Sequence, residues 1–221
     1  MKVAILSANL GNFDKPQPHL QVVEGHLGDY DITHHMFTDN DFPPITGLSA
    51  RLQYRIPKMF GYEMKPEYDI YIWLDASMAI ANTKSVLWLI EQLGDNDCAF
   101  FTHPWRKTIQ EEVDHIEDHL QRGKKYIVSR YKNGLHKEFL KLVEDHPQYK
   151  DDSLFASNVF IYRNNEKMKQ AMETWWFYQS RYFTCDQVQL PFSLWLNDIR
   201  VKIIHQNVFK SLYVSLVSPH K

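Results

Sequence analysis

The chain has 221 residues, 44% of them hydrophobic and 14% aromatic, which permits a sizeable core and argues against global disorder. Its net charge of −2 gives no general attraction to nucleic acid or to an anionic membrane. The N-terminal apolar run is too short for a signal peptide, and no run approaches the roughly 18 apolar residues of a membrane span. We therefore expect a soluble, cytoplasmic protein without a transmembrane segment. The two distant cysteines, Cys98 and Cys185, do not indicate a disulfide framework.

The first half of the chain alternates predicted strands and helices, read from apolar periodicity and from turn residues. In chain order these are a strand at 2–9, a strand at 30–40, a helix at 49–64, a strand at 68–75, a helix at 82–94 and a strand at 97–104. Ser49 is placed to cap the first helix, and Pro57 is expected to kink or restart it.

The second half begins with helices and returns to alternation. In chain order it predicts helices at 108–123 and 134–146, a strand at 153–164, helices at 166–183 and 185–198, and a strand at 200–206. Pro191 is expected to interrupt the last helix.

Alternating strands and helices are typical of an α/β fold whose mostly parallel sheet is covered on both faces. Ligands of such sheets bind beyond the carboxyl ends of the strands. Asp75 follows the apolar run IYIWL at one such end, Ser7 to Asn9 lie at another, and His205 lies at a third. Asp75 is thus a candidate metal ligand, although an aspartate there also caps a loop or the next helix.

Four segments together carry a family resemblance: ILSANLGNFD, FTDND, ARLQYRIPKMFGYEMKPEYDIYIWLDAS and CDQVQL. In this order they resemble the glycosyltransferase-like family formerly called domain of unknown function 616, and more broadly the GT-A class of nucleotide-sugar-dependent glycosyltransferases. The chain is also similar to compact capsid-glycosylating domains of large algal viruses, which would place it in a host cytoplasm. The resemblance implies a single GT-A (Rossmann-like) domain over residues 1–221, with a mostly parallel central sheet flanked by helices.

The resemblance also implies a divalent metal, Mn²⁺ or Mg²⁺, held against the diphosphate of the sugar donor. The motif reads Asp75-Ala76-Ser77 here, so a hydroxyl replaces one of the two usual carboxylates. Asp75 is the first-choice ligand and Ser77 the second, with His205 completing the shell. The alternative for His205 is an ordinary loop histidine.

Donor-binding residues are implied at several positions. Small residues at the end of the first strand would lie beside the base and ribose, Asp39 would bind the uracil or ribose edge, and a basic helix face would contact the diphosphate. The expected set is Ser7, Ala8, Asn9, Asp39, Arg51, Lys58, His103 and Arg106. A turn-forming Asp39 and a solvated helix face remain the alternatives.

Asp186 opens the predicted helix 185–198, and the resemblance makes it the general base that deprotonates the acceptor. A carboxylate at a helix N-terminus stays ionised, which makes it a weak base. Its alternative role is that of an N-cap.

The sequence thus predicts an inverting, metal-assisted glycosyltransferase. It would transfer a sugar from a UDP-sugar, or from a GDP-sugar, to a hydroxyl of a glycan or glycoprotein. The alternative is a module of the same fold that binds nucleotide-sugars or glycans with little catalysis. A hydrolase is disfavoured because the chain lacks a GxSxG motif, and a P-loop is also absent.

Overall fold

The computed structural model describes residues 1–11, 24–42, 47–182 and 185–217, and its centre is a seven-stranded sheet. In spatial order the strands are β2 (Gly25–Leu27), β3 (Tyr30–Thr38), β1 (Lys2–Asn9), β4 (Ile70–Leu74), β7 (Phe155–Arg163), β6 (Cys98–Thr102) and β8 (Val201–Ile204). Strands β1, β3, β4, β6 and β8 run in one direction, and only β2 and β7 run against them. The predicted mostly parallel α/β sheet is therefore confirmed.

Strand β7 lies between β4 and β6 and runs antiparallel to both. Because β7 is antiparallel, its residues 156–158 lie at the carboxyl ends of both neighbouring strands. This brings Ser157 and Asn158 to the edge of the sheet where Asp75 follows β4.

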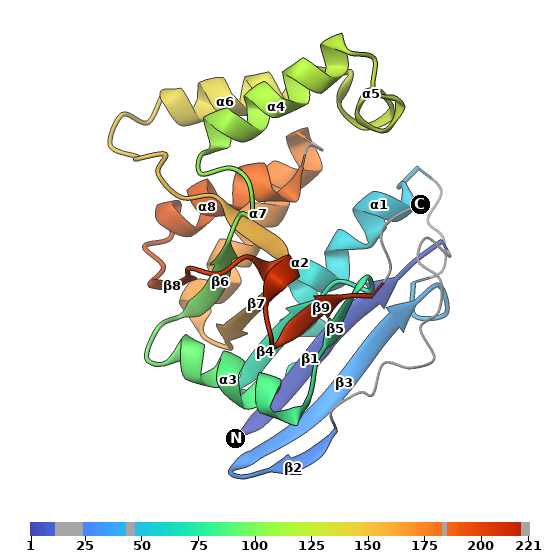
Figure 1. The fold of residues 1–221 in the computed structure, drawn as a ribbon, viewed down its shortest axis with the longest axis vertical. Helices are drawn as coiled ribbons and strands as arrows, with labels where there is room; N and C mark the ends of the chain where they lie inside the picture. Colours follow the sequence, from blue (N-terminus) through green and yellow to red (C-terminus); the bar gives the residue numbers. More distant parts are fainter. Residues whose placement is uncertain (12–23, 43–46, 183–184, 218–221) are drawn as a thin grey trace.

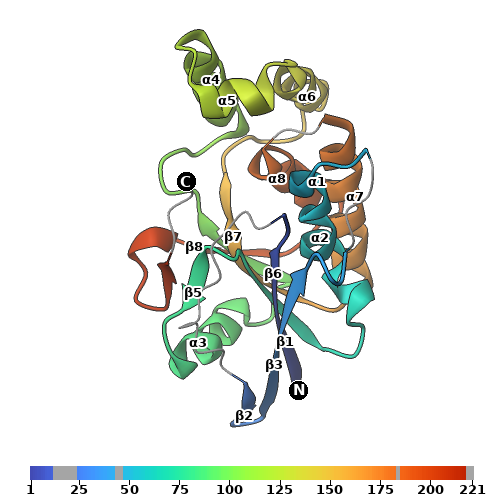
Figure 2. The same ribbon diagram turned by 90° about the vertical axis from the view of Figure 1, so that its right-hand side faces the viewer.

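Helices cover both faces of the sheet (Figures 1 and 2). In chain order they are α1 (Ala50–Gln53), α2 (Arg55–Met64), α3 (Thr83–Leu93), α4 (Ile109–Gln121), α5 (Lys125–Tyr131), α6 (Leu135–Glu144), α7 (Glu166–Tyr182) and α8 (Asp186–Leu196), with a 3-10 turn at Val208–Lys210. One apolar cluster joins α2, α7 and α8 to one face of the sheet, and a second joins α3 to the other. The figures show α3 on the side of the sheet away from α7 and α8.

Strand β4 explains why a fully apolar run is needed at the centre of this sheet. Tyr71 and Trp73 pack into the cluster of α2, α7 and α8, whereas Ile70, Ile72 and Leu74 pack into the cluster of α3. All five side chains are buried, because successive residues of a strand point to opposite faces and both faces are covered.

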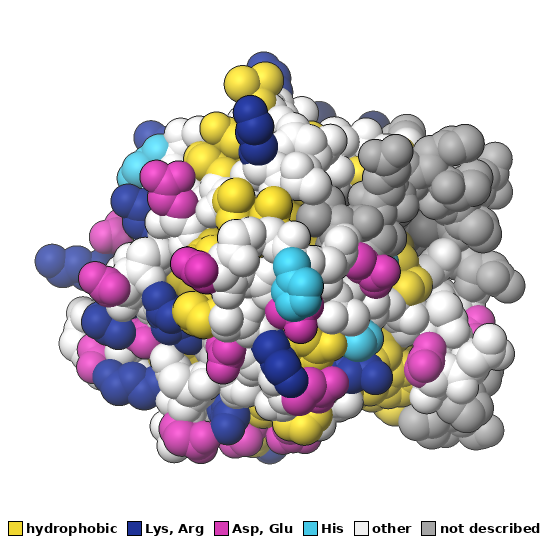
Figure 3. All heavy atoms as spheres, turned by 90° about the horizontal axis from the view of Figure 1, so that it is seen from below, with side chains coloured by type: hydrophobic (Ala, Val, Ile, Leu, Met, Phe, Trp, Pro, Cys, Tyr) yellow, Lys and Arg dark blue, Asp and Glu magenta, His cyan; other side chains and the backbone are white. Residues whose placement is uncertain are grey.

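Two smaller units complete the described chain. Strands β5 (Met78–Ile80) and β9 (Val214–Leu216) pair antiparallel beside α3, and a third apolar cluster packs α4 and α6 against α8. No helix in residues 1–11, 24–42, 47–182 or 185–217 is long and apolar enough to cross a membrane. Seen from below, basic and acidic side chains are interspersed over the surface, with neither sign dominant (Figure 3).

The two prolines in helices behave differently from one another. The predicted helix 49–64 is divided at Tyr54, and Pro57 lies in the first turn of α2, where a backbone N–H has no partner within the helix. A restart near Pro57 is thus confirmed. The interruption predicted at Pro191 is wrong, because α8 continues through it.

Candidate functional site

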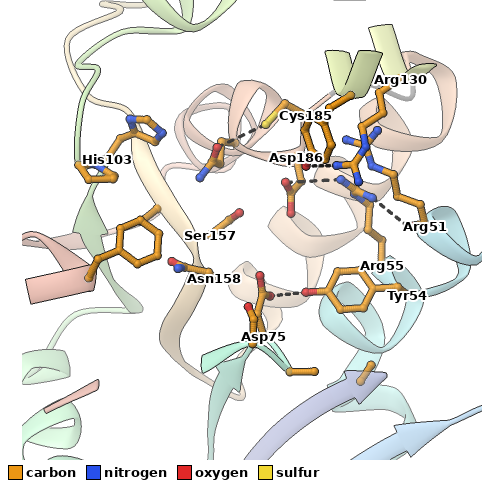
Figure 4. Close-up of a pocket in the computed structure, with 18 of the residues that line it drawn as sticks. Arg51, Tyr54, Arg55, Asp75, His103, Arg130, Ser157, Asn158, Cys185 and Asp186 are labelled. Atoms are coloured by element: carbon orange, nitrogen blue, oxygen red, sulfur yellow. Dashed lines mark hydrogen bonds and ion pairs between the residues drawn. The ribbon is translucent and has the colours of Figure 1, made fainter. Parts of the chain in front are cut away.

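A cavity of about 320 Å³ opens at the carboxyl ends of β1 and β4, and its walls come from segments far apart in the sequence (Figure 4). The sheet contributes the end of β1, the turn after β4 and the first half of β7. Helices α1, α2, α5 and α8 form one wall, and the segment after β6 forms another. A volume of this size suits a small ligand.

Asp75 lies at the floor of the cavity, and three donors hold one of its carboxylate oxygens. Oδ1 accepts hydrogen bonds from the Tyr54 hydroxyl and from Trp73 Nε1, the latter at 2.6 Å, while Lys58 Nζ lies 3.5 Å away. The side chain is 20% exposed and faces the cavity. Three donors on one oxygen fix the orientation of this carboxylate.

Asp186, the first residue of α8, belongs to a buried ion cluster. Lys58 Nζ donates to Asp186 Oδ2 at 2.7 Å, and an Arg55 guanidinium nitrogen lies 3.5 Å from Oδ1. Lys58 is 1% exposed and also contacts the Ser157 hydroxyl at 3.4 Å. Burial raises the pKa of Asp186, but the charges of Lys58 and Arg55 outweigh it and hold this pKa well below its usual range. Each carboxylate oxygen of Asp186 therefore pairs with one cation, Oδ1 with Arg55 and Oδ2 with Lys58.

A wall of three arginines adjoins Asp186. Arg51 from α1 donates to the Tyr131 hydroxyl at 2.6 Å and lies over its ring, and Arg55 donates to the Arg51 carbonyl at 2.8 Å. Arg130 from α5 lies beside them and contacts Tyr126. Burial, with the positive charge of Arg51 next in size, lowers the pKa of Arg130. We call Arg51, Arg55 and Arg130 the arginine wall.

His103 lies across the cavity from the arginine wall (Figure 4). Its Nδ1 accepts the backbone N–H of Arg106 at 3.0 Å, which assigns the ring proton to Nε2. Burial, and secondly the charge of Arg106, lower the pKa of His103 to about 4. The ring is thus neutral near pH 7 and is a hydrogen-bond donor. Arg106 itself is ion-paired with buried Glu112.

An aromatic pair borders the cavity on the side of His103. Trp105 is 69% exposed, and its ring stacks on Phe209 with the ring centroids 5.6 Å apart. Both residues line the cavity. A large aromatic surface left in solvent beside a polar cavity offers an apolar face to a ligand.

The structure brings together most of the residues predicted from the sequence. Those that line the cavity are Ala8, Asn9, Arg51, Asp75, Ser77, His103, Arg106 and Asp186. Lys58 is buried just behind the wall, between the two aspartates. Ser7 is buried with its hydroxyl 3.2 Å from His34, and Asp39 accepts the backbone N–H of Gly11 at 2.9 Å. These two do not line the cavity.

Of the three predicted metal ligands, Asp75 and Ser77 line the cavity and His205 does not. His205 is exposed and follows β8, three strand spacings from β4, or about 14 Å across the sheet. Asp75 is already held by donors that include an ammonium group. Within the described residues no three His, Cys, Asp or Glu side chains are grouped to hold a metal ion. Asp75 Oδ1 is already held by three donors, so a divalent cation in this cavity would have to take most of its oxygen ligands from water and from the phosphates of a ligand.

Sequence reasoning missed several residues of the cavity. Arg55 stood out only as part of a basic helix face, and Arg130 lies in a stretch where no motif was recognised. Nothing in the sequence marked Tyr54 and Trp73 as hydrogen-bond donors to Asp75. An aromatic residue inside a predicted helix or near the end of a predicted strand is usually a core residue. The spacing of four residues between Arg51 and Arg55 is the signal that placed Arg55 on that basic helix face.

No protein-family profile matches this chain, and no curated protein matches it. Similar solved structures include a glycosyltransferase involved in the glycosylation of the major capsid of PBCV-1, at 9% identity and a TM-score of 0.44, over 92% of this chain and 81% of that one. A197 from STIV is 7% identical with a TM-score of 0.38, over 93% of this chain and 82% of that one. The bifunctional glycosyltransferase WbbM is 12% identical with a TM-score of 0.43, over 91% of this chain and 38% of that one.

Proposed function

We propose that this protein is a glycosyltransferase that moves a sugar from a nucleoside diphosphate sugar to a hydroxyl group of a glycan or glycoprotein. The observation that carries the proposal is one cavity at the carboxyl ends of the sheet with an arginine wall, two carboxylates and an exposed aromatic pair. The four sequence segments that resemble glycosyltransferases support it, because three of them contribute residues to the lining of this cavity. UDP is the favoured nucleotide, and GDP is the second choice.

Glycosyl transfer needs the charge of the leaving diphosphate stabilised and the acceptor hydroxyl deprotonated. Cationic side chains of the cavity serve the first need. For the second, the sequence assigns Asp186, whose ion pairs make it a weak base, while Asp75 is the other carboxylate of the cavity. The base role of Asp186 stays a prediction.

The proposal is tested by measuring the thermal unfolding of the protein with UDP-, GDP- and CMP-sugars, each with and without Mn²⁺. A ligand that binds the folded chain raises the melting temperature by mass action. We expect a UDP- or GDP-sugar to do so, and we expect the nucleoside diphosphate to be released when a glycan acceptor is added. If no nucleotide-sugar binds, the proposed function is wrong.

Trp105 is proposed to stack on a sugar ring at the mouth of the cavity. Trp105→Ala removes a 69% exposed ring that does not support the core, so the stability should change by less than about 0.5 kcal/mol. We expect the KM for the acceptor to rise about tenfold with the donor affinity unchanged, as measured by steady-state kinetics and calorimetry. Leu212→Ala, at an 85% exposed position, is the matched control. An unchanged acceptor KM would assign the ring no role in binding.

The alternative is a nucleotide-sugar-binding module without turnover. It is favoured by one observation, the pairing of both Asp186 oxygens with cations. Donor binding without release of nucleoside diphosphate, in the presence of a range of acceptors, would support this alternative.

A further inference from the structure

The cavity concentrates positive charge although the whole chain is slightly acidic. Five cationic side chains lie in or just behind its walls: Arg51, Arg55, Lys58, Arg106 and Arg130. Three anionic ones face them: Asp75, Asp186 and Glu112. With His103 neutral, the described side chains of the cavity carry two more positive charges than negative ones. Such an excess in a partly buried site is stabilised by a multiply charged anion.

Three of these cations have a carboxylate partner within the described residues. Lys58 and Arg55 are paired with Asp186, and Arg106 is paired with Glu112. Within the part of the chain that the structure describes, Arg130 forms no ion pair with a carboxylate, and its contacts are the hydroxyl and ring of Tyr126. The nearby charge of Arg51 also disfavours the charged form of Arg130. An anion between these helices would remove that repulsion.

We propose that the arginine wall, with Arg130 as its main open cation, binds the diphosphate of the donor without a divalent metal ion. Guanidinium groups pair with phosphate oxygens through two parallel hydrogen bonds, and they supply the charge that a metal would otherwise supply. Nε2 of His103, on the opposite side of the cavity, already lies 3.5 Å from an Arg106 guanidinium nitrogen, so the contacts to the phosphates come from the arginine wall. That the ligand is a sugar donor rests on the proposed function. That the arginine wall binds a diphosphate group does not.

The wall is held in place by contacts between distant segments. The hydrogen bond from Arg51 to Tyr131 joins α1 to α5 across 80 residues of sequence, and the Arg55 side chain is held between the Arg51 carbonyl and Asp186. A rigid set of donors loses little conformational entropy on binding, which favours affinity. Arg130 extends from the same helix as Tyr131 and so shares this support.

The test is calorimetry with inorganic pyrophosphate, UDP, GDP and uridine, each in EDTA and in Mn²⁺. We expect pyrophosphate, and UDP or GDP, to bind in EDTA with an affinity within threefold of that in Mn²⁺. Uridine, which lacks phosphate, should bind at least tenfold more weakly than UDP. Binding of both pyrophosphate and nucleotides only when Mn²⁺ is present would overturn the proposal and leave the proposed function standing.

Variants locate the site. Arg130→Gln should weaken pyrophosphate and UDP binding about tenfold and leave uridine binding unchanged, with Arg130→Lys in between because it keeps the charge and loses the planar fork. Arg122→Gln is the control, since Arg122 is an exposed arginine that pairs with Asp118 and does not line the cavity. Melting curves identify any variant that fails to fold, and Arg51→Gln then serves in place of Arg130→Gln.

The remaining outcomes separate the two proposals. Pyrophosphate binding in EDTA that depends on Arg130, without binding of any sugar nucleotide, would support the metal-free diphosphate site and refute the proposed function. An equal loss in Arg122→Gln and Arg130→Gln, or no pyrophosphate binding in either buffer, would refute the metal-free site.

Discussion

At the scale of single residues, Asp186 has the clearest conflict between sequence and structure. The sequence assigns it the role of general base, yet Lys58 and Arg55 hold its pKa well below the usual range. A carboxylate with so low a pKa accepts a proton poorly, whereas it neutralises two buried cations well. Its geometry therefore suits a residue that positions the cations of the cavity.

Asp186→Asn tests this. The substitution leaves Lys58, which is 1% exposed, with Asp75 as its carboxylate partner at 3.5 Å, so we expect a loss of about 2 to 4 kcal/mol in the free energy of unfolding, measured in urea. Asp75→Asn is the comparison, since it keeps the tight pair at 2.7 Å. If Asp186→Asn instead abolishes turnover and leaves both stability and donor affinity unchanged, Asp186 is the base that the sequence predicts.

At the scale of elements, the approach of α2 to β1 brings Arg55 and Lys58 to the cavity. Gly61 makes this close approach possible, because a Cβ atom at its position would lie 2.2 Å from Leu6 Cδ1. Leu6 is fully buried and has little room to move. The glycine thus sets the distance between helix and sheet.

Gly61→Ala should destabilise the protein by about 1 to 3 kcal/mol, because overpacking outweighs the higher helix propensity of alanine. The double variant Leu6→Val, Gly61→Ala removes the colliding methyl group. We therefore expect its loss in chemical denaturation to be smaller than the sum of the two single losses. Additive losses would show that the helix can move and that this contact does not fix its position.

At the scale of the whole molecule, buried ionisable groups predict how stability depends on pH. The folded-state pKa of His103 is lowered to about 4 from its ordinary value of 6.5. Between these values the unfolded chain binds a proton that the folded chain does not, so stability falls as the pH is lowered through this window. For Asp97, burial acts to raise the pKa, but hydrogen bonds from Arg200 outweigh the effect of burial, so the folded-state pKa is lowered. The stabilisation that the Asp97 carboxylate contributes is therefore present above the ordinary pKa of an aspartate and is lost as the pH falls through the lowered folded-state pKa.

We therefore expect the melting temperature to fall steadily from pH 7 to pH 4 and to continue falling below that. His103→Gln, which cannot titrate, should flatten the upper part of this profile and leave the part below pH 4 unchanged. Differential scanning calorimetry over a pH series measures both. An unchanged slope between pH 6.5 and 4 in His103→Gln would assign the acid sensitivity to other groups.

The sequence by itself predicted the strands β1, β3, β4, β6, β7 and β8, and that Asp75 follows one of them, whereas the short strands β2, β5 and β9 were not predicted. Apolar runs such as IYIWL must be buried on both faces, and this requires a sheet covered by helices. It therefore also predicted the edge of the sheet at which the cavity opens, and Ala8, Asn9 and Asp75 do line that cavity.

Only the tertiary structure decided which of these side chains meet. Strand order separated His205 from Asp75, and the reversed β7 brought Ser157 to the cavity. The hydrogen bond between Arg51 and Tyr131 joined α5, which carries Arg130, to a helix 80 residues earlier. Sequence periodicity reports the faces of single elements, because it depends on local geometry. The neighbours of an element depend on packing across the whole chain, and so does the charge of the site.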